Sequence, residues 1–294
     1  MTLGDVRHLG GWFVHLRLGF QVFLSPIFLF GFLIAGGHIN RDLVLGYLAF
    51  HVFGYGGGTA FNSYYDRDTG PIGGLEHPPP IPRGLLAFSI LWQLIGFAIA
   101  LAVNLSFAAI YAIMFWMSVG YSHPRTRFKG HALAALATVA IGQGVFGYLG
   151  GWACARGELV SALTLPGLLG ATAATLLTVG FYPLTGIYQI EEDRARGDQT
   201  LPVWLGPAKS FRFAFACLLL GGIAAIALIV MQFQIGEALF LAVILAGLLF
   251  AVWRWSRTFQ QAAIIQNFRT IMRLYALTSL GFIAWIWLHL IGFL

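Results

Sequence analysis

The sequence has few charged residues. Only 10% of its 294 residues are Asp, Glu, Lys or Arg, whereas soluble domains contain about 25%. Hydrophobic residues make up 59% of the chain, and a soluble fold of this length cannot bury so much apolar surface. This composition excludes an ordinary cytosolic enzyme, a disordered chain and a nucleic-acid-binding module, despite a net charge of +6.

Cysteines and signal-peptide features are also scarce. The 2 cysteines, Cys154 and Cys217, both have apolar neighbours in the sequence, where a free cysteine usually behaves as a small hydrophobic residue. Their number predicts neither a disulfide framework nor a thiolate metal site. The first residues lack a small-residue cleavage site after a compact apolar core, so we predict no cleavable signal peptide.

Long apolar runs are abundant. A helix that crosses a membrane needs about 20 mainly apolar residues. We predict nine such spans, at about residues 18–37, 42–62, 85–103, 106–121, 131–153, 162–187, 211–231, 236–253 and 271–293. The sequence therefore predicts an all-α polytopic membrane protein, with residues 1–294 forming a single membrane domain.

The basic residues predict how the chain is oriented. With nine spans, 15 of the 17 Lys and Arg residues fall on one side, and only Arg41 and Arg156 fall on the other. Cytoplasmic loops are enriched in Lys and Arg, so we predict a cytoplasmic N-terminus and a C-terminus on the opposite side. Three polar loops, at residues 62–84, 121–131 and 188–210, then lie on the cytoplasmic side.

The first 17 residues are compatible with an interfacial segment. An amphipathic helix over residues 5–17 would turn one face to lipid and the other to headgroups. The lipid-facing residues would be Val6, Leu9, Trp12, Phe13 and Leu16, and the headgroup-facing residues would be Arg7, His15 and Arg17. A plain lead-in to the first span explains the pattern equally well.

The first polar constellation follows the second predicted span. Residues 61–70 read FNSYYDRDTG, and the i, i+4 spacing of Asn62 and Asp66 places both on one face of a continuing helix. Asp68 follows on the emerging loop. Such oxygen ligands suit Mg²⁺, which one or two carboxylates commonly hold together with substrate phosphates. A solvated helix end at the membrane boundary is the alternative interpretation.

The second constellation follows the sixth predicted span. Residues 188–202 read YQIEEDRARGDQTLP, in which Gln189 and Asp193 repeat the i, i+4 spacing, with Glu191 and Glu192 between them. Taken alone, this segment is compatible with a solvated loop. Two such groups on the same side of the membrane can instead bracket a Mg²⁺–diphosphate.

The third constellation is basic. Residues 121–130 read YSHPRTRFKG, with Arg125, Arg127 and Lys129 close together. The preference for positive charge in cytoplasmic loops is sufficient to explain them. They also predict a phosphate clamp, in which Arg offers bidentate contacts and Tyr121 offers a hydroxyl donor.

Together the three constellations resemble motifs of the UbiA superfamily of intramembrane prenyltransferases. That family has nine transmembrane helices, with NDxxDxxxD after the second, a tyrosine-led basic loop after the fourth and DxxxD after the sixth. All three motifs fall after the corresponding predicted spans, and the resemblance covers essentially the whole chain. The segment after the second motif also keeps Asp193, Gly197, Thr200, Leu201, Pro202 and Gly206.

The chain departs from the family pattern at three of five acidic positions. Asn62, Asp66 and Asp193 match the motifs, whereas Ser63, Gly70 and Gln189 replace motif aspartates. Asp68, Glu191 and Glu192 are available to compensate, although none occupies a motif position. Fewer carboxylates weaken Mg²⁺ binding, which is compatible with one metal ion where relatives hold two, or with altered or lost activity.

The resemblance implies an enzyme that ionises an isoprenyl diphosphate with Mg²⁺ and transfers the prenyl group to a lipophilic acceptor within the membrane lipid. Implied catalytic residues are Asp66, Asp193 and Tyr121. We predict that the metal ligands are Asn62, Asp66, Asp68, Gln189, Glu192 and Asp193, of which Asp68 and Glu192 lie outside the motif positions. The predicted diphosphate-binding residues are Arg67, Arg125, Arg127, Lys129 and Arg194.

Three alternatives remain open from the sequence. A UbiA-type terpene cyclase would use the same ionisation without an acceptor. A non-catalytic membrane protein that binds isoprenoids or lipids would account for the missing carboxylates. A secondary transporter agrees less well with the sequence, because the acidic residues lie in interfacial loops, whereas transporter sites usually lie near the middle of the membrane.

Overall fold

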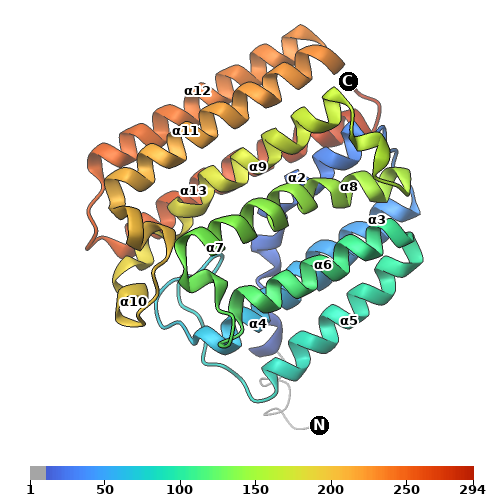
Figure 1. The fold of residues 1–294 in the computed structure, drawn as a ribbon. Helices are drawn as coiled ribbons and strands as arrows, with labels where there is room; N and C mark the ends of the chain where they lie inside the picture. The colour runs from blue at the N-terminus through green and yellow to red at the C-terminus, as the bar shows by residue number, and fades with distance from the viewer. Residues whose placement is uncertain (1–10) are drawn as a thin grey trace.

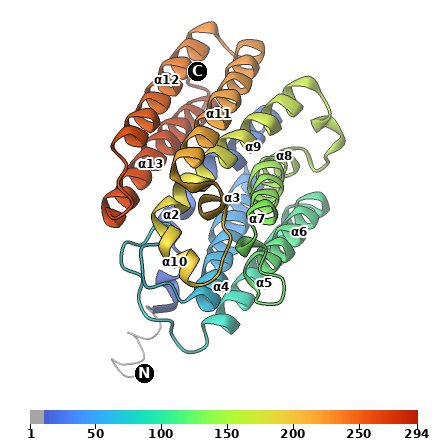
Figure 2. The same ribbon diagram turned by 60° about the vertical axis from the view of Figure 1, so that its left-hand side comes forward.

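The computed structural model describes residues 11–294, which form a bundle of long helices that run side by side (Figure 1). Within this described part, β-bridge pairing is limited to two isolated bridges, Ile72 with Leu75 and His131 with Gln199. The predicted all-α fold is confirmed. In both ribbon views, α4 and α10 lie near the same end of the bundle (Figures 1 and 2).

The helix bounds lie close to the predicted spans, with the largest differences at two starts. Helix α13 begins about seven residues earlier than predicted. Helix α11 begins about ten residues earlier, but it is kinked at Gly206, whose φ of 71° is not helical. The elements are α2 (Leu18–Ile34), α3 (Arg41–Tyr47), η1 (Leu48–Tyr55), α4 (Gly56–Asp66), α5 (Leu85–Val103), α6 (Leu105–Ser122), η2 (Phe128–Gly130), α7 (Ala132–Thr138), η3 (Val139–Phe146), α8 (Gly147–Arg156), η4 (Val160–Ala162), α9 (Leu165–Gly186), η5 (Ile187–Gln189), α10 (Ile190–Ala195), α11 (Leu201–Gln232), α12 (Ile235–Thr258) and α13 (Ile264–Leu290).

Eight helices within the described residues are long and apolar enough to cross a membrane. The remaining predicted span, the second in the chain, corresponds to α3, η1 and α4, which are continuous from residue 41 to 66. At 1.5 Å per residue this stretch is about 39 Å long, which is sufficient to span a membrane. Its glycine run and its polar residues, such as His51 and Asn62, make it less apolar than the other eight.

Glycines allow α2 and α8 to pack closely against each other in the core. A Cβ atom added at Gly151 would lie 1.8 Å from the carbonyl oxygen of Phe28, and one added at Gly31 would lie 2.0 Å from that of Tyr148. The two backbones are therefore in direct contact at these positions. Small residues of this kind allow membrane helices to pack closely, and close packing supplies much of their association energy.

Replacement of Gly151 by alanine is expected to destabilise the folded protein by about 1–3 kcal/mol, because the added methyl group meets backbone that cannot move aside easily. The apparent melting temperature in detergent should fall by several degrees. Gly247→Ala is the matched control, since nothing lies within 4 Å of a Cβ at that position. Equal melting temperatures for the two variants would contradict this account of the core.

Two helices contain π-helical segments, η1 and η3. Such segments are rare and frequently occur at functional sites. Both line the same cavity, with Gly54 and Tyr55 from η1 and Gly142 and Gln143 from η3. The irregular turns thus occur where the helices surround the site described below.

The structure corrects the predicted interfacial face of the N-terminal segment. His15, Leu16 and Arg17 are all buried, whereas Phe13 is 45% exposed. The prediction that His15 and Arg17 face headgroups is therefore wrong, because this part of the chain turns into the bundle before α2 begins. Val6, Arg7 and Leu9 lie outside the described residues.

Candidate active site

A cavity of about 330 Å³ opens near the end of the bundle that holds α4 and α10. One part of its wall is ionic and includes Asp66, Lys129 and Arg196. Another part is apolar or aromatic and includes Leu24 and Phe181. The cavity is therefore suited to an elongated ligand with a charged head and an apolar body.

The first acidic group is positioned by the end of α4. The helix continues to Asp66 and ends because Arg67 adopts a left-handed conformation, with φ of 51°. Asn62 and Asp66 therefore share one helical face, as their spacing predicts, and both line the cavity. The amide nitrogen of Asn62 donates to Ser122 Oγ at 3.0 Å, which leaves its carbonyl oxygen available to a cation.

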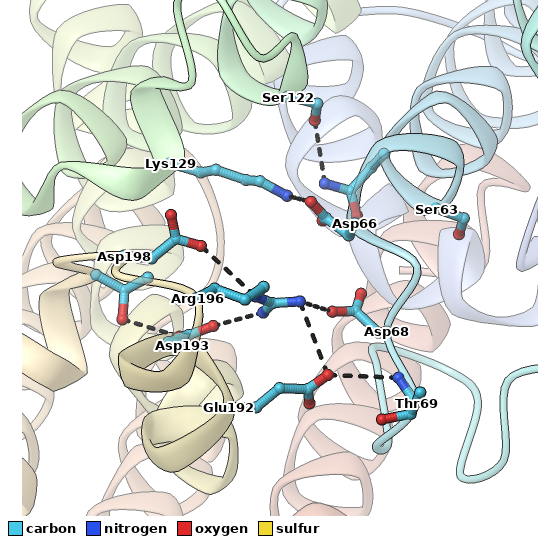
Figure 3. Close-up of polar contacts among 12 residues, drawn as sticks. Ser63, Asp66, Asp68, Thr69, Ser122, Lys129, Glu192, Asp193, Arg196 and Asp198 are labelled. Carbon is cyan, nitrogen blue, oxygen red and sulfur yellow. Dashed lines mark hydrogen bonds and ion pairs between the residues drawn. The ribbon is translucent and has the colours of Figure 1, made fainter.

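Lys129 brings the basic loop to this acidic group. Its side chain is 11% exposed, and its ammonium group forms an ion pair with the carboxylate of Asp66 (Figure 3). Burial lowers the pKa of Lys129, whereas the neighbouring charge of Asp66 opposes that shift. A lysine so placed can neutralise negative charge that develops on a ligand in the cavity.

The second acidic group surrounds a guanidinium. Arg196, just after α10, lies between Asp68 on one side and Asp193 and Asp198 on the other (Figure 3). Its hydrogen bond to Asp193 Oδ1 is 2.7 Å long, and it forms a further ion pair with Asp68. Burial acts against its positive charge, but the hydrogen bonds that it donates to Asp68 and Asp193 raise the pKa of Arg196 overall.

Arg127 joins the basic loop to the loop after α10. It donates two hydrogen bonds to the carboxylate of Asp198, at 2.8 Å and 2.6 Å. The backbone N–H of Gln199 also donates to the carbonyl oxygen of Gly130 at 2.8 Å. Burial raises the pKa of Asp198, but the hydrogen bonds and charge of Arg127 outweigh burial, so its pKa lies below the usual 3.8.

Replacement of Asp198 by asparagine is expected to destabilise the protein at neutral pH by about 1–3 kcal/mol, because Arg127 loses a charged acceptor. A carboxylate with a lowered pKa stabilises the fold above its unfolded pKa, and this contribution disappears as the pH falls through the folded pKa. The difference in melting temperature between wild type and variant should therefore shrink between pH 7 and about pH 3. A difference independent of pH would contradict the assigned ion pair.

The structure brings most of the predicted site residues together, within the part of the chain that it describes. Those that line the cavity are Asn62, Asp66, Asp68, Tyr121, Lys129, Gln189 and Asp193. Glu192 and Arg127 contact residues of the cavity wall. Three predicted diphosphate ligands, Arg67, Arg125 and Arg194, are exposed and are not part of the wall. Arg194 instead pairs with the exposed Glu191 at 3.0 Å.

Sequence reasoning missed four residues of the site. Arg17 is only 9% exposed and donates to Ser63 Oγ at 2.7 Å, so a residue expected at the membrane surface lies in the cavity wall. Arg196, Asp198 and Thr200 also line the cavity. One signal was present in the sequence, because Arg196 follows Glu192 by four positions and Asp193 by three, the spacings of helical ion pairs.

The fold and the site together define a multi-helix membrane protein in which acidic and basic loops meet over a buried cavity. A family model described as the UbiA prenyltransferase family matches residues 23–277. The chain therefore belongs to this family, as the sequence motifs predicted. It is a UbiA-type prenyltransferase and an integral, multi-pass membrane protein.

Individual relatives support this placement. The chain is 29% identical over 203 residues to digeranylgeranylglyceryl phosphate synthase from Natronomonas pharaonis, covering 68% of this chain and 70% of the relative. It is 30% identical over 165 residues to protoheme IX farnesyltransferase from Aeropyrum pernix, covering 53% of each. Its fold matches a UbiA homolog from Archaeoglobus fulgidus bound to DMAPP and Mg²⁺, with TM-score 0.66, 22% identity and coverage of 93% and 99%.

The donor set of the cavity fits a divalent ion. Asn62, Asp66, Gln189 and Asp193 offer the carboxylate and amide oxygens that Mg²⁺ prefers, and all four line one cavity. Within residues 11–294, no three His, Cys, Asp or Glu side chains are grouped as metal ligands. Arg127 and Arg196 lie between the carboxylates, and Lys129 pairs with Asp66.

Proposed function

We propose that this protein is a Mg²⁺-dependent intramembrane prenyltransferase, which ionises an isoprenyl diphosphate and transfers the prenyl group to a lipophilic acceptor. One observation carries the proposal. A single cavity joins paired carboxylates and buried cations to an apolar chamber, as a ligand with a diphosphate head and a hydrocarbon tail requires. The solved Archaeoglobus homolog bound to DMAPP and Mg²⁺ supports the same class of ligand.

The metal ligands in this proposal come from both acidic loops. Asn62 and Asp66 on α4 would hold Mg²⁺ from one side, and Gln189 and Asp193 from the other, with Asp68 and Glu192 nearby. When bound, Mg²⁺ draws negative charge onto the leaving diphosphate. Asp66 and Asp193 are the two acids retained at motif positions, so their carboxylates would be the principal ligands.

Cations of the protein bind the diphosphate itself. Lys129 and Arg17 are both buried and line the cavity, so their charges are little screened by solvent. Tyr121 lines the same wall, with its hydroxyl 3.4 Å from that of Tyr182, and is placed to donate a hydrogen bond to a phosphate oxygen. These fixed donors stabilise the charge that accumulates on the diphosphate as the allylic C–O bond breaks.

The apolar part of the cavity protects the resulting carbocation. Phe181 and Tyr275 stack with their ring centroids 4.8 Å apart, and both line the cavity. Aromatic faces attract a cation, and apolar walls keep out the water that would capture it. An acceptor that enters from the membrane would then form the new bond, and its proton would leave as the bond forms.

The orientation of the site in the membrane stays a prediction from the sequence. We propose that the cavity mouth faces the cytoplasm, because the three polar loops around it carry many Lys and Arg residues, and such loops usually lie on the cytoplasmic side. We also propose that residues 1–294 act as one membrane domain, since the three loops that build the site come from helices spread along the sequence.

Product analysis tests the proposed reaction. Purified protein in detergent would be incubated with geranylgeranyl diphosphate, Mg²⁺ and a mixture of glyceryl phosphate lipids and quinone precursors. We expect a prenylated acceptor, detected by mass spectrometry, with no prenylation when Mg²⁺ is chelated. A cyclic hydrocarbon formed without any acceptor would identify a terpene cyclase instead. Absence of both products with geranyl, farnesyl and geranylgeranyl diphosphates would contradict the proposal.

A further inference from the structure

Arg196 has an unusual environment, because acidic side chains lie on several sides of it. Its guanidinium lies among four carboxylates, those of Asp68, Glu192, Asp193 and Asp198 (Figure 3). The nitrogen-to-oxygen distances are 2.7 Å to Asp193, 3.6 Å to Asp198 and 3.7 Å to Glu192, and Asp68 forms a further ion pair. Asp68 comes from the loop after α4, and the other three come from α10 and the loop after it.

This arrangement resembles the surroundings of a bound cation more than those of a surface arginine. Each of the three guanidinium nitrogens lies within 4 Å of at least one carboxylate. The side chain of Arg196 is 25% exposed, and that of Asp68 only 5%. Arg196 therefore bridges the two acidic loops, which is the geometric task of a divalent ion between paired carboxylates.

Glu192 takes the place in space of the aspartate that the family motif has at position 70. A Cβ atom added at Gly70 would lie 2.8 Å from Oε2 of Glu192, so the Glu192 carboxylate occupies the space that a side chain at position 70 would enter. The backbone N–H of Thr69 donates to Oε1 of the same carboxylate at 3.3 Å. Glu192 thus restores a negative charge at this place, and Arg196 neutralises it.

Arg196 is one of three cations that offset the negative charge of this group. Ion pairs within 4 Å connect five carboxylates to three cations. The carboxylates are Asp66, Asp68, Glu192, Asp193 and Asp198, and the cations are Arg127, Lys129 and Arg196. Five negative and three positive charges leave a net charge of −2 within this group, without the diphosphate and without the nearby Arg17 of the cavity wall. Without Arg196 the same group would carry −3.

We propose that Arg196 is a built-in cation that takes the place of a second divalent ion, so that this site binds one metal ion together with a diphosphate. This inference rests on the proposed function. Arg196 acts here as a positioning residue, because it holds the two acidic loops together through Asp68 and Asp193. This role of Arg196 also explains why the site tolerates Gly70 and Gln189 at two positions where the motifs have aspartate, because one metal ion needs fewer carboxylate ligands than two.

The number of bound metal ions tests this inference without any turnover. Mn²⁺ would be titrated into purified protein in detergent with inorganic diphosphate, and unbound Mn²⁺ would be followed by electron paramagnetic resonance. We expect one Mn²⁺ per wild-type chain. Arg196→Gln should bind two, because four carboxylates lose their shared cation, whereas Arg196→Lys keeps the charge and should bind one. Arg212→Gln, an exposed position outside the cavity, is the matched control and should bind one.

Each other outcome has a defined meaning. Two Mn²⁺ ions on the wild-type chain would overturn the inference and leave the proposed function intact, and this result does not depend on whether a variant folds. An unchanged count in Arg196→Gln, with wild-type melting behaviour, would also overturn it. No diphosphate-dependent Mn²⁺ binding to the wild-type chain would overturn both the inference and the proposed function.

Discussion

Replacement of Asp66 by asparagine is expected to lower the rate of diphosphate release by about a hundredfold to a thousandfold, the cost of removing one group that stabilises the transition state. Asp66 is the acid retained in the first motif, and it lies at the end of α4 in contact with Lys129. Asparagine keeps the shape and one oxygen but loses the charge that holds a divalent ion. The measurement is steady-state diphosphate release from a prenyl diphosphate in the presence of Mg²⁺.

The control for Asp66→Asn is Asp42→Asn. Asp42 lies in the first turn of α3, which is joined to α4 through η1 and therefore lies at the opposite end of that helical stretch. We expect this variant to retain wild-type turnover. Equal losses in both variants, or wild-type turnover in Asp66→Asn, would contradict the assignment of Asp66 to the active site.

Replacement of Lys129 by glutamine is expected to reduce kcat/KM by about a hundredfold or more, because a fixed cation beside the developing charge is lost. Arg125, four positions earlier in the same loop, is exposed and is not part of the cavity wall. Arg125→Gln should therefore cause a much smaller loss. Parallel kinetics of the two variants, with melting temperatures to confirm folding, measure the difference.

A larger loss in Arg125→Gln than in Lys129→Gln would contradict the placement of the basic loop. The sequence alone treats these two residues alike, as members of one run of cations. The structure separates them, because η2 turns Lys129 inward to Asp66 while Arg125 stays exposed. The pair of variants therefore tests a distinction that only the folded chain provides.

Local periodicity explains what the sequence could predict. Asn62 and Asp66 share a helical face because α4 continues through both, and the apolar runs give most helix positions to within a few residues. The family resemblance placed the three polar loops together, and the ion pairs of Asp66 with Lys129 and of Asp68 with Arg196 join the same loops in the structure.

Long-range ion pairs explain what the sequence could not predict. Arg196 and Asp68 are separated by 128 positions, and Arg127 and Asp198 by 71, so no local pattern links them. Arg127 was predicted to bind diphosphate, and in the structure it holds the two loops together through Asp198. Arg17 belongs to a segment whose amphipathic pattern suggests an interfacial helix, but its burial depends on how the chain enters the bundle.

The central claim is that the two acidic loops and the buried cations form one Mg²⁺-dependent site for a prenyl diphosphate. The most direct test is diphosphate release by the wild-type protein and an Asp66→Asn/Asp193→Asn double variant, each with and without Mg²⁺. The account predicts release by the wild type only when Mg²⁺ is present, and none by the double variant. Release that persists in the double variant, or that is the same without Mg²⁺, would contradict it.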